Sequence, residues 1–152
     1  MSIIIKLGEN NEKLIPLLDE YEADLAEAKL HLGIKGKTIE KALIENPTWQ
    51  HYYDQKRIEL YTLKKHFENE IARVRGKLFR RFKENHSREL NEREIAKYTD
   101  SEKEFLTMSA LFHEVQEVYM QYESVVEAFR SRGFALNNIT KIRVVSMEEA
   151  EL

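Results

Sequence analysis

Apolar residues recur at helical spacing along most of the chain. The first run alternates steps of four and three residues, a heptad pattern that makes one face of a helix apolar. It consists of Leu14, Leu18, Tyr21, Leu25, Ala28 and Leu32. The pattern predicts a helix from about residue 12 to residue 31 that is ended by Gly33 and Gly36.

A second run predicts a longer helix from Thr48 to about Glu84, because its apolar positions form a stripe with the ordinary helical period. These positions are Leu60, Leu63, Phe67, Ile71, Val74, Leu78 and Phe82. Residues 37–45 predict a short separate helix, since the residue before a proline, here Pro47, is disfavoured in helical conformation. A further small helix is expected over residues 91–98.

The third run predicts a long helix that begins near Ser101, where Ser101 and Glu104 fit a capping box. Its apolar seam consists of Phe105, Met108, Phe112, Val115, Tyr119, Tyr122, Val126 and Phe129. Leu111, Val118 and Val125 widen this seam beyond that of a two-stranded coiled coil, so the helix must contact more than one neighbour. We expect the seam to be the main oligomerisation surface.

The third helix is predicted to end at Gly133. With Gly133 in the C′ position, Phe129 and Phe134 occupy the two positions that touch in a Schellman cap. Residues 2–7 and residues 141–146 predict short strands. Because isolated short strands are unstable in water, these two segments are expected to pair within one chain or between chains.

Together these elements predict an all-α protein, a single helical domain over residues 1–152 with strand-like segments at the two ends. A length of 152 residues also favours one domain. The long heptad seams and the loose terminal strands favour a protomer that forms a homo-oligomer. The alternative is a monomeric three-helix bundle closed by a small β-clip.

The composition narrows the classes of function. The chain has no cysteine, which excludes disulfides, thiol catalysis and iron–sulfur clusters. No apolar run approaches the roughly 18 residues of a membrane span. The apolar residues 3–5 lack the basic flank of a signal peptide. We therefore expect a soluble protein of a reducing cytoplasm that does not contact membranes.

Charge is distributed unevenly behind a net charge of −3. Residues 9–27 are acidic, with Lys13 as the only basic residue, whereas residues 71–83 hold six Lys and Arg and no acid. Arg75 and Lys83 belong to this run, and the other four cations fall within about 100° of a helical wheel: Arg73, Lys77, Arg80 and Arg81. Like charges on one face repel one another unless an anion neutralises them, and a nucleic-acid backbone is such an anion. The alternative is that these cations pair with an acidic helix of a neighbouring subunit.

Three uncharged residues lie among these cations. Phe79 and Phe82 either stack on bases or belong to the core, which is the commoner role for phenylalanine. Gly76 costs about 1 kcal/mol in a helix interior relative to alanine. It either permits a close approach to the backbone or is simply tolerated.

A second basic set follows the third helix and consists of Arg130, Arg132, Lys141 and Arg143. Cations in a last helical turn also stabilise the helix dipole. That role accounts for Arg130 and Arg132 but leaves Lys141 and Arg143 unexplained. The set is therefore a secondary candidate for binding nucleic acid.

Catalytic patterns are missing from the sequence. The histidines are scattered without metal-ligand spacing, and the chain has neither a nucleophile elbow nor a phosphate loop. We expect a non-enzymatic protein without cofactor or metal. Residues 88–98 resemble the opening of a helix-turn-helix, but the next helix would present Glu102 and Glu104 to the phosphates, which disfavours a duplex reader.

Two segments resemble the UvsY-type recombination mediators of tailed bacteriophages. The first is Ser131-Arg132-Gly133-Phe134-Ala135 after a long helix, followed by a short segment with Ile139 and Arg143. The second is Arg75 and Lys77, a basic pair two residues apart among apolar residues, just before a loop. The resemblance extends over roughly residues 21–145.

The resemblance implies a non-catalytic accessory protein of homologous recombination. Such mediators are ring-like homo-oligomers that bind single-stranded DNA and help a RecA-like recombinase to replace the single-strand-binding protein. In this chain the resemblance and the charge pattern together predict DNA binding through Arg73, Arg75, Lys77, Arg80, Arg81 and Lys83. A phage-encoded protein of this kind would act in the host cytoplasm. The alternative is a scaffolding coiled-coil oligomer whose basic stripe pairs with acidic proteins.

Overall fold

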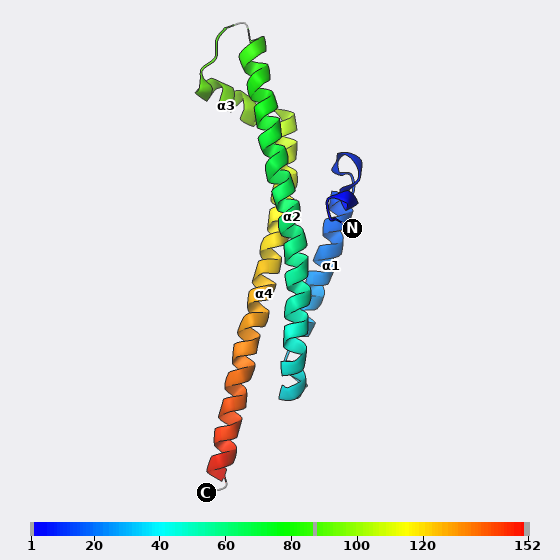
Figure 1. Cartoon of the computed structure of the whole chain (residues 1–152), viewed down its shortest axis with the longest axis vertical. Coiled ribbons are helices and arrows are strands. Elements are labelled where there is room, and N and C mark those ends of the chain that lie inside the picture. Colours follow the sequence, from blue (N-terminus) through cyan, green and yellow to red (C-terminus); the bar gives the residue numbers. More distant parts are fainter. Residues whose placement is uncertain (1, 87, 151–152) are drawn as a thin grey trace.

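Four α-helices and two short 3-10 turns make up the computed structural model, which describes residues 2–86 and 88–150, with side chains up to residue 146. The elements in chain order are η1 (Ile5–Leu7), η2 (Glu9–Asn11), α1 (Leu14–Leu32), α2 (Ile39–Asn85), α3 (Glu92–Ser101) and α4 (Lys103–Ala150). Figure 1 shows α2 and α4 running antiparallel as the long axis of an elongated molecule. The described residues contain no strand, which confirms the all-α class.

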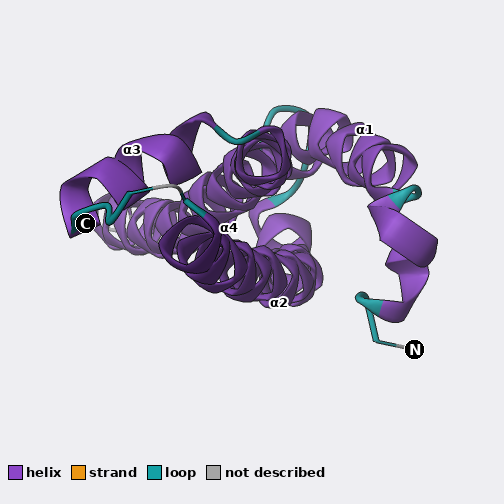
Figure 2. Ribbon diagram, turned by 90° about the horizontal axis from the view of Figure 1, so that it is seen from above, coloured by secondary structure: helices purple, strands orange, loops and turns teal. Residues whose placement is uncertain are grey.

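The two shorter helices pack at different places on the α2/α4 pair. The helix α1 lies along the half of the pair where α2 begins, and α3 folds back against the end where α2 stops (Figure 1). Figure 2, which looks along the long axis, shows α1 and α3 beside the central pair rather than between its members. The central pair is therefore the frame on which both ends of the molecule are built.

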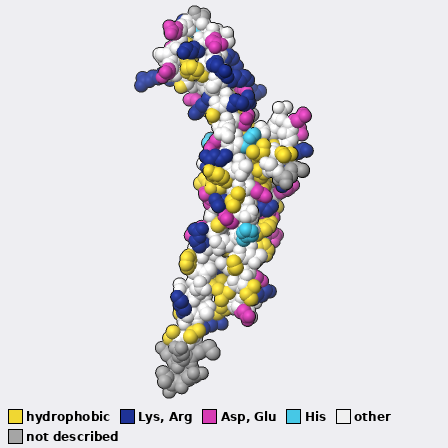
Figure 3. Space-filling model, viewed as in Figure 1, with side chains coloured by type: hydrophobic (Ala, Val, Ile, Leu, Met, Phe, Trp, Pro, Cys, Tyr) yellow, Lys and Arg dark blue, Asp and Glu magenta, His cyan; other side chains and the backbone are white. Residues whose placement is uncertain are grey.

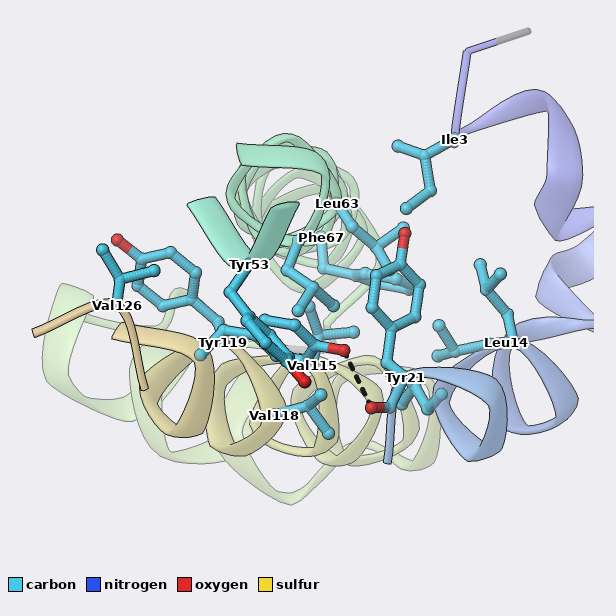
Figure 4. Packing of buried hydrophobic residues seen from close by; sticks show 14 of the residues in the cluster. Ile3, Leu14, Tyr21, Tyr53, Leu63, Phe67, Val115, Val118, Tyr119 and Val126 are labelled. Atoms are coloured by element: carbon cyan, nitrogen blue, oxygen red, sulfur yellow. Dashed lines mark hydrogen bonds between the residues drawn. The ribbon is translucent and has the colours of Figure 1, made fainter. Parts of the chain in front are cut away.

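The predicted apolar seams form the core. In the first seam Leu14, Leu18, Tyr21 and Ala28 are buried, and the stripe of α2 supplies the fully buried residues Leu60, Leu63, Phe67, Val74 and Leu78. The Tyr122 ring of α4 lies 5.7 Å from the Tyr21 ring of α1 and 6.1 Å from the Tyr53 ring of α2, between ring centres. Figure 4 shows side chains of all three helices packed together in this core. The Tyr122 hydroxyl donates a hydrogen bond of 2.9 Å to the Tyr21 carbonyl and so ties α4 to α1. The expectation that α4 contacts more than one neighbour is confirmed.

The α4 seam packs into this intrachain core, and its role as an oligomerisation surface stays a prediction. Val115, Tyr122 and Phe129 are fully buried against α1 and α2. The remaining members are buried or partly buried: Phe105, Met108, Phe112, Tyr119 and Val126. The heptad pattern reported burial correctly, but periodicity does not distinguish a partner within the chain from one in another subunit.

At the two predicted strand segments the described residues have other conformations. In segment 2–7, residues Ile5–Leu7 form the 3-10 turn η1, and Ile3 and Leu7 are buried. The turn buries Ile3 and Leu7 but leaves Ile5 68% exposed, whereas an extended strand would place all three side chains on the same face. Segment 141–146 continues α4. Extending a helix that has already formed adds one hydrogen bond for each residue that is fixed, and this gain outweighs the modest β-propensity of Ile and Val.

The predicted interruption at Pro47 was wrong. Thr38 caps α2, accepting a hydrogen bond of 3.2 Å from the Lys41 amide, and the helix then continues through Pro47 to Asn85. A proline inside a helix removes one backbone hydrogen bond. The residue before it, Asn46, is held in its helical position by contacts with α4, so tertiary packing offsets the local cost.

Gly133 lies inside α4 and does not end it, which corrects the predicted helix stop. The Asn46 amide nitrogen of α2 donates a hydrogen bond of 3.0 Å to the Phe129 carbonyl. A Cβ atom at position 133 would lie 3.0 Å from that nitrogen. Phe129 is the residue whose carbonyl accepts the helical bond from Gly133, so the missing side chain opens this carbonyl to a second donor.

Arg132 is the second polar residue buried at this level, with 5% of its surface exposed. Its Nη1 donates to the Asn46 side-chain oxygen at 2.9 Å and to the Ala42 carbonyl at 3.1 Å. Its Nε donates to the Leu32 carbonyl at 3.0 Å, at the C-terminal end of α1, where helix carbonyls lack partners within the helix. Burial lowers the pKa of Arg132, and the nearby Glu45 opposes this effect. We call Asn46, Arg132 and Gly133 the polar clamp.

The helix α3 begins with a capping box. The Asn91 side chain accepts from the Glu94 amide at 2.9 Å, and the Glu94 carboxylate accepts from the Asn91 amide at 3.0 Å. The Asn91 amide also lowers the pKa of Glu94. The predicted box at Ser101 was wrong, because Ser101 ends α3 and its hydroxyl donates to the Tyr98 carbonyl.

The polar clamp leads to a stability prediction. Arg132→Met keeps an apolar stem but removes the guanidinium, and with it the donors to the buried carbonyls of Leu32 and Ala42. We expect the free energy of unfolding to fall by about 3 kcal/mol, the combined cost of such unpaired groups. Urea unfolding followed by circular dichroism measures it. Arg130→Met is the matched control, because Arg130 is exposed and its described ion pair, with Glu127, is also exposed, so its loss costs less than about 0.5 kcal/mol. Equal effects of the two substitutions would contradict the clamp.

Candidate nucleic-acid interface

The last three turns of α2 position the six predicted cations. Val74 and Leu78 are fully buried in a second apolar cluster with Phe105, and this fixes the rotation of the helix about its axis. As a result all six cations are exposed: Arg73, Arg75, Lys77, Arg80, Arg81 and Lys83. Figure 3 shows Lys and Arg side chains gathered at this end of the molecule, with acidic side chains among them.

Three of the cations already have a carboxylate partner in the chain. Arg73 pairs with Glu70 at 2.9 Å, and this hydrogen bond raises the pKa of Arg73. From the beginning of α4, Glu104 pairs with Lys77 at 3.1 Å. In the same way Glu102 pairs with Arg81 at 2.8 Å. The sequence predicted no such partners, since Glu102 and Glu104 are distant along the chain. Pairs this exposed contribute about 0–1 kcal/mol each, so a phosphate can compete with them.

The other three cations form no ion pair with another described residue. The Arg75 guanidinium lies 5.0 Å from the centre of the Phe105 ring, and the Lys83 ammonium lies 5.7 Å from that of Phe79. Such contacts leave the charge intact, because a ring attracts a cation without neutralising it. Arg80 extends from the exposed side of the helix.

An outward row on α2 combines these charges with an open stretch of backbone. At 100° per residue, Arg73, Lys77 and Arg80 fall on one side of Gly76 and Lys83 on the other. Apart from the adjoining helix backbone, no atom of the described residues lies within 4 Å of the position of a Cβ at Gly76, so packing against these residues does not require the glycine. We call this row the cationic face: Arg73, Gly76, Lys77, Arg80, Arg81 and Lys83.

A groove between α2 and α3 borders the cationic face. Its volume is about 330 Å³. Its lining consists of Arg75, Phe79, Glu92, Ile95, Ala96, Thr99 and Asp100. Phe79 is 38% exposed and lies at the border, whereas Phe82 is partly buried in the second cluster and tilts against Tyr98. The sequence did not predict this groove, because nothing in the local pattern indicates where α3 folds back.

The second basic set does not join the first. Arg132 is buried in the polar clamp, so its predicted role in DNA binding was wrong. Arg130 is exposed and pairs with Glu127 at 2.7 Å. Lys141 and Arg143 are exposed near the C-terminal end of α4, at the opposite end of the molecule from the cationic face (Figure 1).

A polar cleft of about 220 Å³ between η1, α1 and α2 contains further lysines, Lys6 and Lys56. Its charges are largely balanced inside the chain. The Asp24 carboxylate accepts from the Tyr52 hydroxyl at 2.7 Å and pairs with Lys56 at 3.6 Å. The hydrogen bond to Asp24 raises the pKa of Tyr52 to about 12. This cleft therefore offers less uncompensated positive charge than the cationic face.

Other kinds of site find little support in the described part of the chain. The helix-turn-helix resemblance at residues 88–98 leads into α4, which buries its apolar side against α2 and so is not free to enter a groove of DNA. Among the described residues, no group of three or more His, Asp or Glu side chains is placed to hold a metal ion. Of the helices that the structure describes, none combines the length and apolar character needed to cross a bilayer.

The fold and this surface define an elongated all-α protein with a cationic face at one end. Comparison with protein-family models, curated proteins and solved structures finds no match for the chain.

The two helical glycines allow a paired prediction. Gly76→Ala should raise the free energy of unfolding by about 1 kcal/mol, because the added methyl group meets open space and alanine favours the helix. Gly133→Ala should lower it by about 1 kcal/mol or more, since Asn46 is held at both ends of its amide and cannot move aside. Thermal unfolding of both variants measures the difference. Stabilisation by both substitutions would show that no close contact exists at Gly133.

Proposed function

We propose that the protein is a non-catalytic recombination mediator that binds single-stranded DNA through its cationic face. The observation that carries the proposal is the exposed row of cations around the open backbone of Gly76. Glu70, Glu104 and Glu102 balance Arg73, Lys77 and Arg81, but Arg80 and Lys83 form no ion pair with another described residue, so the face keeps positive charge that an external anion can neutralise. In this proposal the phosphate backbone runs along the helix axis and supplies an anion at regular intervals.

Two features favour a single strand over a duplex. Arg73, Lys77 and Arg80 are spaced along the axis by about 4.5–6 Å, so one extended backbone can contact them in turn. Phe79 exposes its ring beside the row, and only unpaired bases present a free face for stacking. The contacts involve the backbone and ring faces, which all sequences share, so binding is independent of sequence to a first approximation.

The more specific role rests on the resemblance to UvsY-type mediators. In this proposal the bound strand is handed to a RecA-like recombinase while the single-strand-binding protein is displaced. The resemblance in the α2 segment coincides with the cationic face at Lys77. The resembling segment at residues 131–135 does not contribute to the cationic face. Its Arg132 and Gly133 belong to the polar clamp.

Self-association is part of the proposal, but through a different surface from the predicted seam. The helix α4 continues beyond the level at which α2 begins (Figure 1). On this projecting end Ile142 is 65% exposed and Val145 51%, and Phe134, closer to α2, is 66% exposed. Apolar side chains on a helix without a neighbour favour contact with another copy of the chain. Assembly would link several weak DNA sites, which raises avidity without new contacts.

A scaffolding role is the second candidate, and the ion pairs of the cationic face favour it. Glu70, Glu102 and Glu104 show that carboxylates fit these cations, so an acidic protein surface would fit them as well. Binding to nucleic acid separates the two candidates, because a scaffold of this kind requires none.

Removal of two unpaired cations tests the DNA site. In the variant Arg80→Gln/Lys83→Gln we expect weaker binding to labelled single strands of any sequence. The plot of log affinity against log salt should become less steep by about 1.4, or 0.7 for each lost phosphate contact. Fluorescence anisotropy over a salt series measures both. Lys13→Gln/Lys29→Gln removes the same charge from the region of α1 and should leave affinity nearly unchanged. Equal affinity of the cationic-face variant and the unmodified protein rules out this site.

The projecting end of α4 is tested separately. Ile142→Ser/Val145→Ser should lower the molar mass measured by sedimentation equilibrium, because it removes apolar surface from the proposed contact. The helix core should keep its stability, since both residues are at least half exposed. The control Leu106→Ser changes an exposed apolar residue at the other end of α4 and should preserve the assembly. An unaltered mass of the double variant would exclude this surface.

A further inference from the structure

We propose that the α2–α3 groove takes one unpaired base of the strand bound on the cationic face, and that it prefers guanine. This inference rests on the proposed function and names the part of the strand that the groove recognises. The groove lies against the cationic face, since Phe79 lines it and the Lys83 ammonium lies 5.7 Å from the centre of that ring. A strand that follows the cations therefore passes its opening.

The shape and lining suit a single planar ring system. A volume of about 330 Å³ is at the small end of the range for ligand pockets, roughly 300–1,000 Å³. Ile95 is 3% exposed and forms an apolar floor, and Ala96 and the Phe79 ring add apolar walls. An aromatic ring at the entrance gives a base a stacking partner.

The polar groups of the groove select among the bases. Glu92 and Asp100 lie on the α3 side, and neither forms an ion pair with another described residue. A carboxylate accepts hydrogen bonds and repels phosphate, so these groups favour base edges that donate. Guanine presents two adjacent donors, the ring N–H and the amino group, which match the two oxygens of one carboxylate. Thymine presents one donor between two acceptor oxygens. A carboxylate repels these oxygens because they also carry negative partial charge.

Thr99 provides a second, independent observation. The residue is 95% buried, yet it lines the groove, and its hydroxyl forms no hydrogen bond with another described residue. Every described side-chain nitrogen or oxygen that is fully shut off from solvent has a partner, so this hydroxyl faces the open space of the groove. A threonine hydroxyl both donates and accepts, and it can bond to a guanine ring nitrogen or carbonyl. The groove therefore contains an unused polar group at its floor.

A peptide side chain is the competing occupant. An apolar side chain of a partner protein would fill the space but would leave Glu92, Asp100 and the Thr99 hydroxyl without partners. Burying such groups unpaired costs affinity. A base with donors on one edge satisfies them, and the adjoining cations bind its phosphate.

The test compares three labelled strands of equal length in fluorescence anisotropy. One strand is all thymidine, the second has isolated guanines among thymidines, and the third replaces those guanines by abasic sites. We expect the guanine strand to bind about fivefold more tightly than the thymidine strand, the low end of what stacking of one base contributes. The abasic strand should bind no better than the thymidine strand, because all three keep their phosphates.

Two variants assign the preference to the groove. Phe79→Ala removes the stacking ring, and Asp100→Asn removes an acceptor while leaving the fold of the exposed position unchanged. Both should reduce the guanine preference to nearly one. Glu84→Gln is the matched control, since it removes one exposed negative charge from the same end of α2 and should strengthen binding of all strands equally.

The outcomes separate this inference from the proposed function. Equal, salt-sensitive binding of the three strands by the unmodified protein would overturn the base groove and leave the DNA site standing. A guanine preference that survives both Phe79→Ala and Asp100→Asn would also overturn it. No binding of any strand would overturn both proposals.

Discussion

The guanidinium of Arg132 joins three helices at one end of the molecule. It donates to the end of α1, to the α2 backbone at Ala42 and to the Asn46 side chain, which in turn donates to the α4 backbone. A buried charge with this many partners tolerates little displacement, because any shift leaves polar groups unpaired. The clamp thus fixes the register of α2 against α4, and the apolar seams between them then close along the rest of the pair.

That register determines what the other end of the molecule presents. Because α2 and α4 are antiparallel, fixing Asn46 against Phe129 brings the beginning of α4 next to the last turns of α2 (Figure 1). Glu102 and Glu104 then lie beside Arg81 and Lys77, and Phe105 packs into the second apolar cluster. The same alignment turns the remaining cations outward. The charge of the proposed DNA site is therefore set by packing at the far end of the helices as well as by its own sequence.

The sequence predicted the helices and their buried faces, because periodicity reports burial directly. It also predicted the exposed cations of α2, since Val74 and Leu78 define the opposite side of the helix. It misread Gly133 as a helix end, because the reason for that glycine is Asn46, whose amide bonds a carbonyl 83 residues further along the chain. The ion pairs with Glu102 and Glu104 and the groove beside α3 likewise arise from contacts that no local pattern contains.

The most direct test of the proposed mediator role is the assembly of a RecA-like recombinase on single-stranded DNA already covered by single-strand-binding protein. Release of a fluorescently labelled single-strand-binding protein would report this assembly in real time. Adding the protein should shorten the delay before release, and adding the variant that lacks the charges of Arg80 and Lys83 should not. An unchanged delay, at concentrations at which the protein is bound to the strand, would contradict the mediator role.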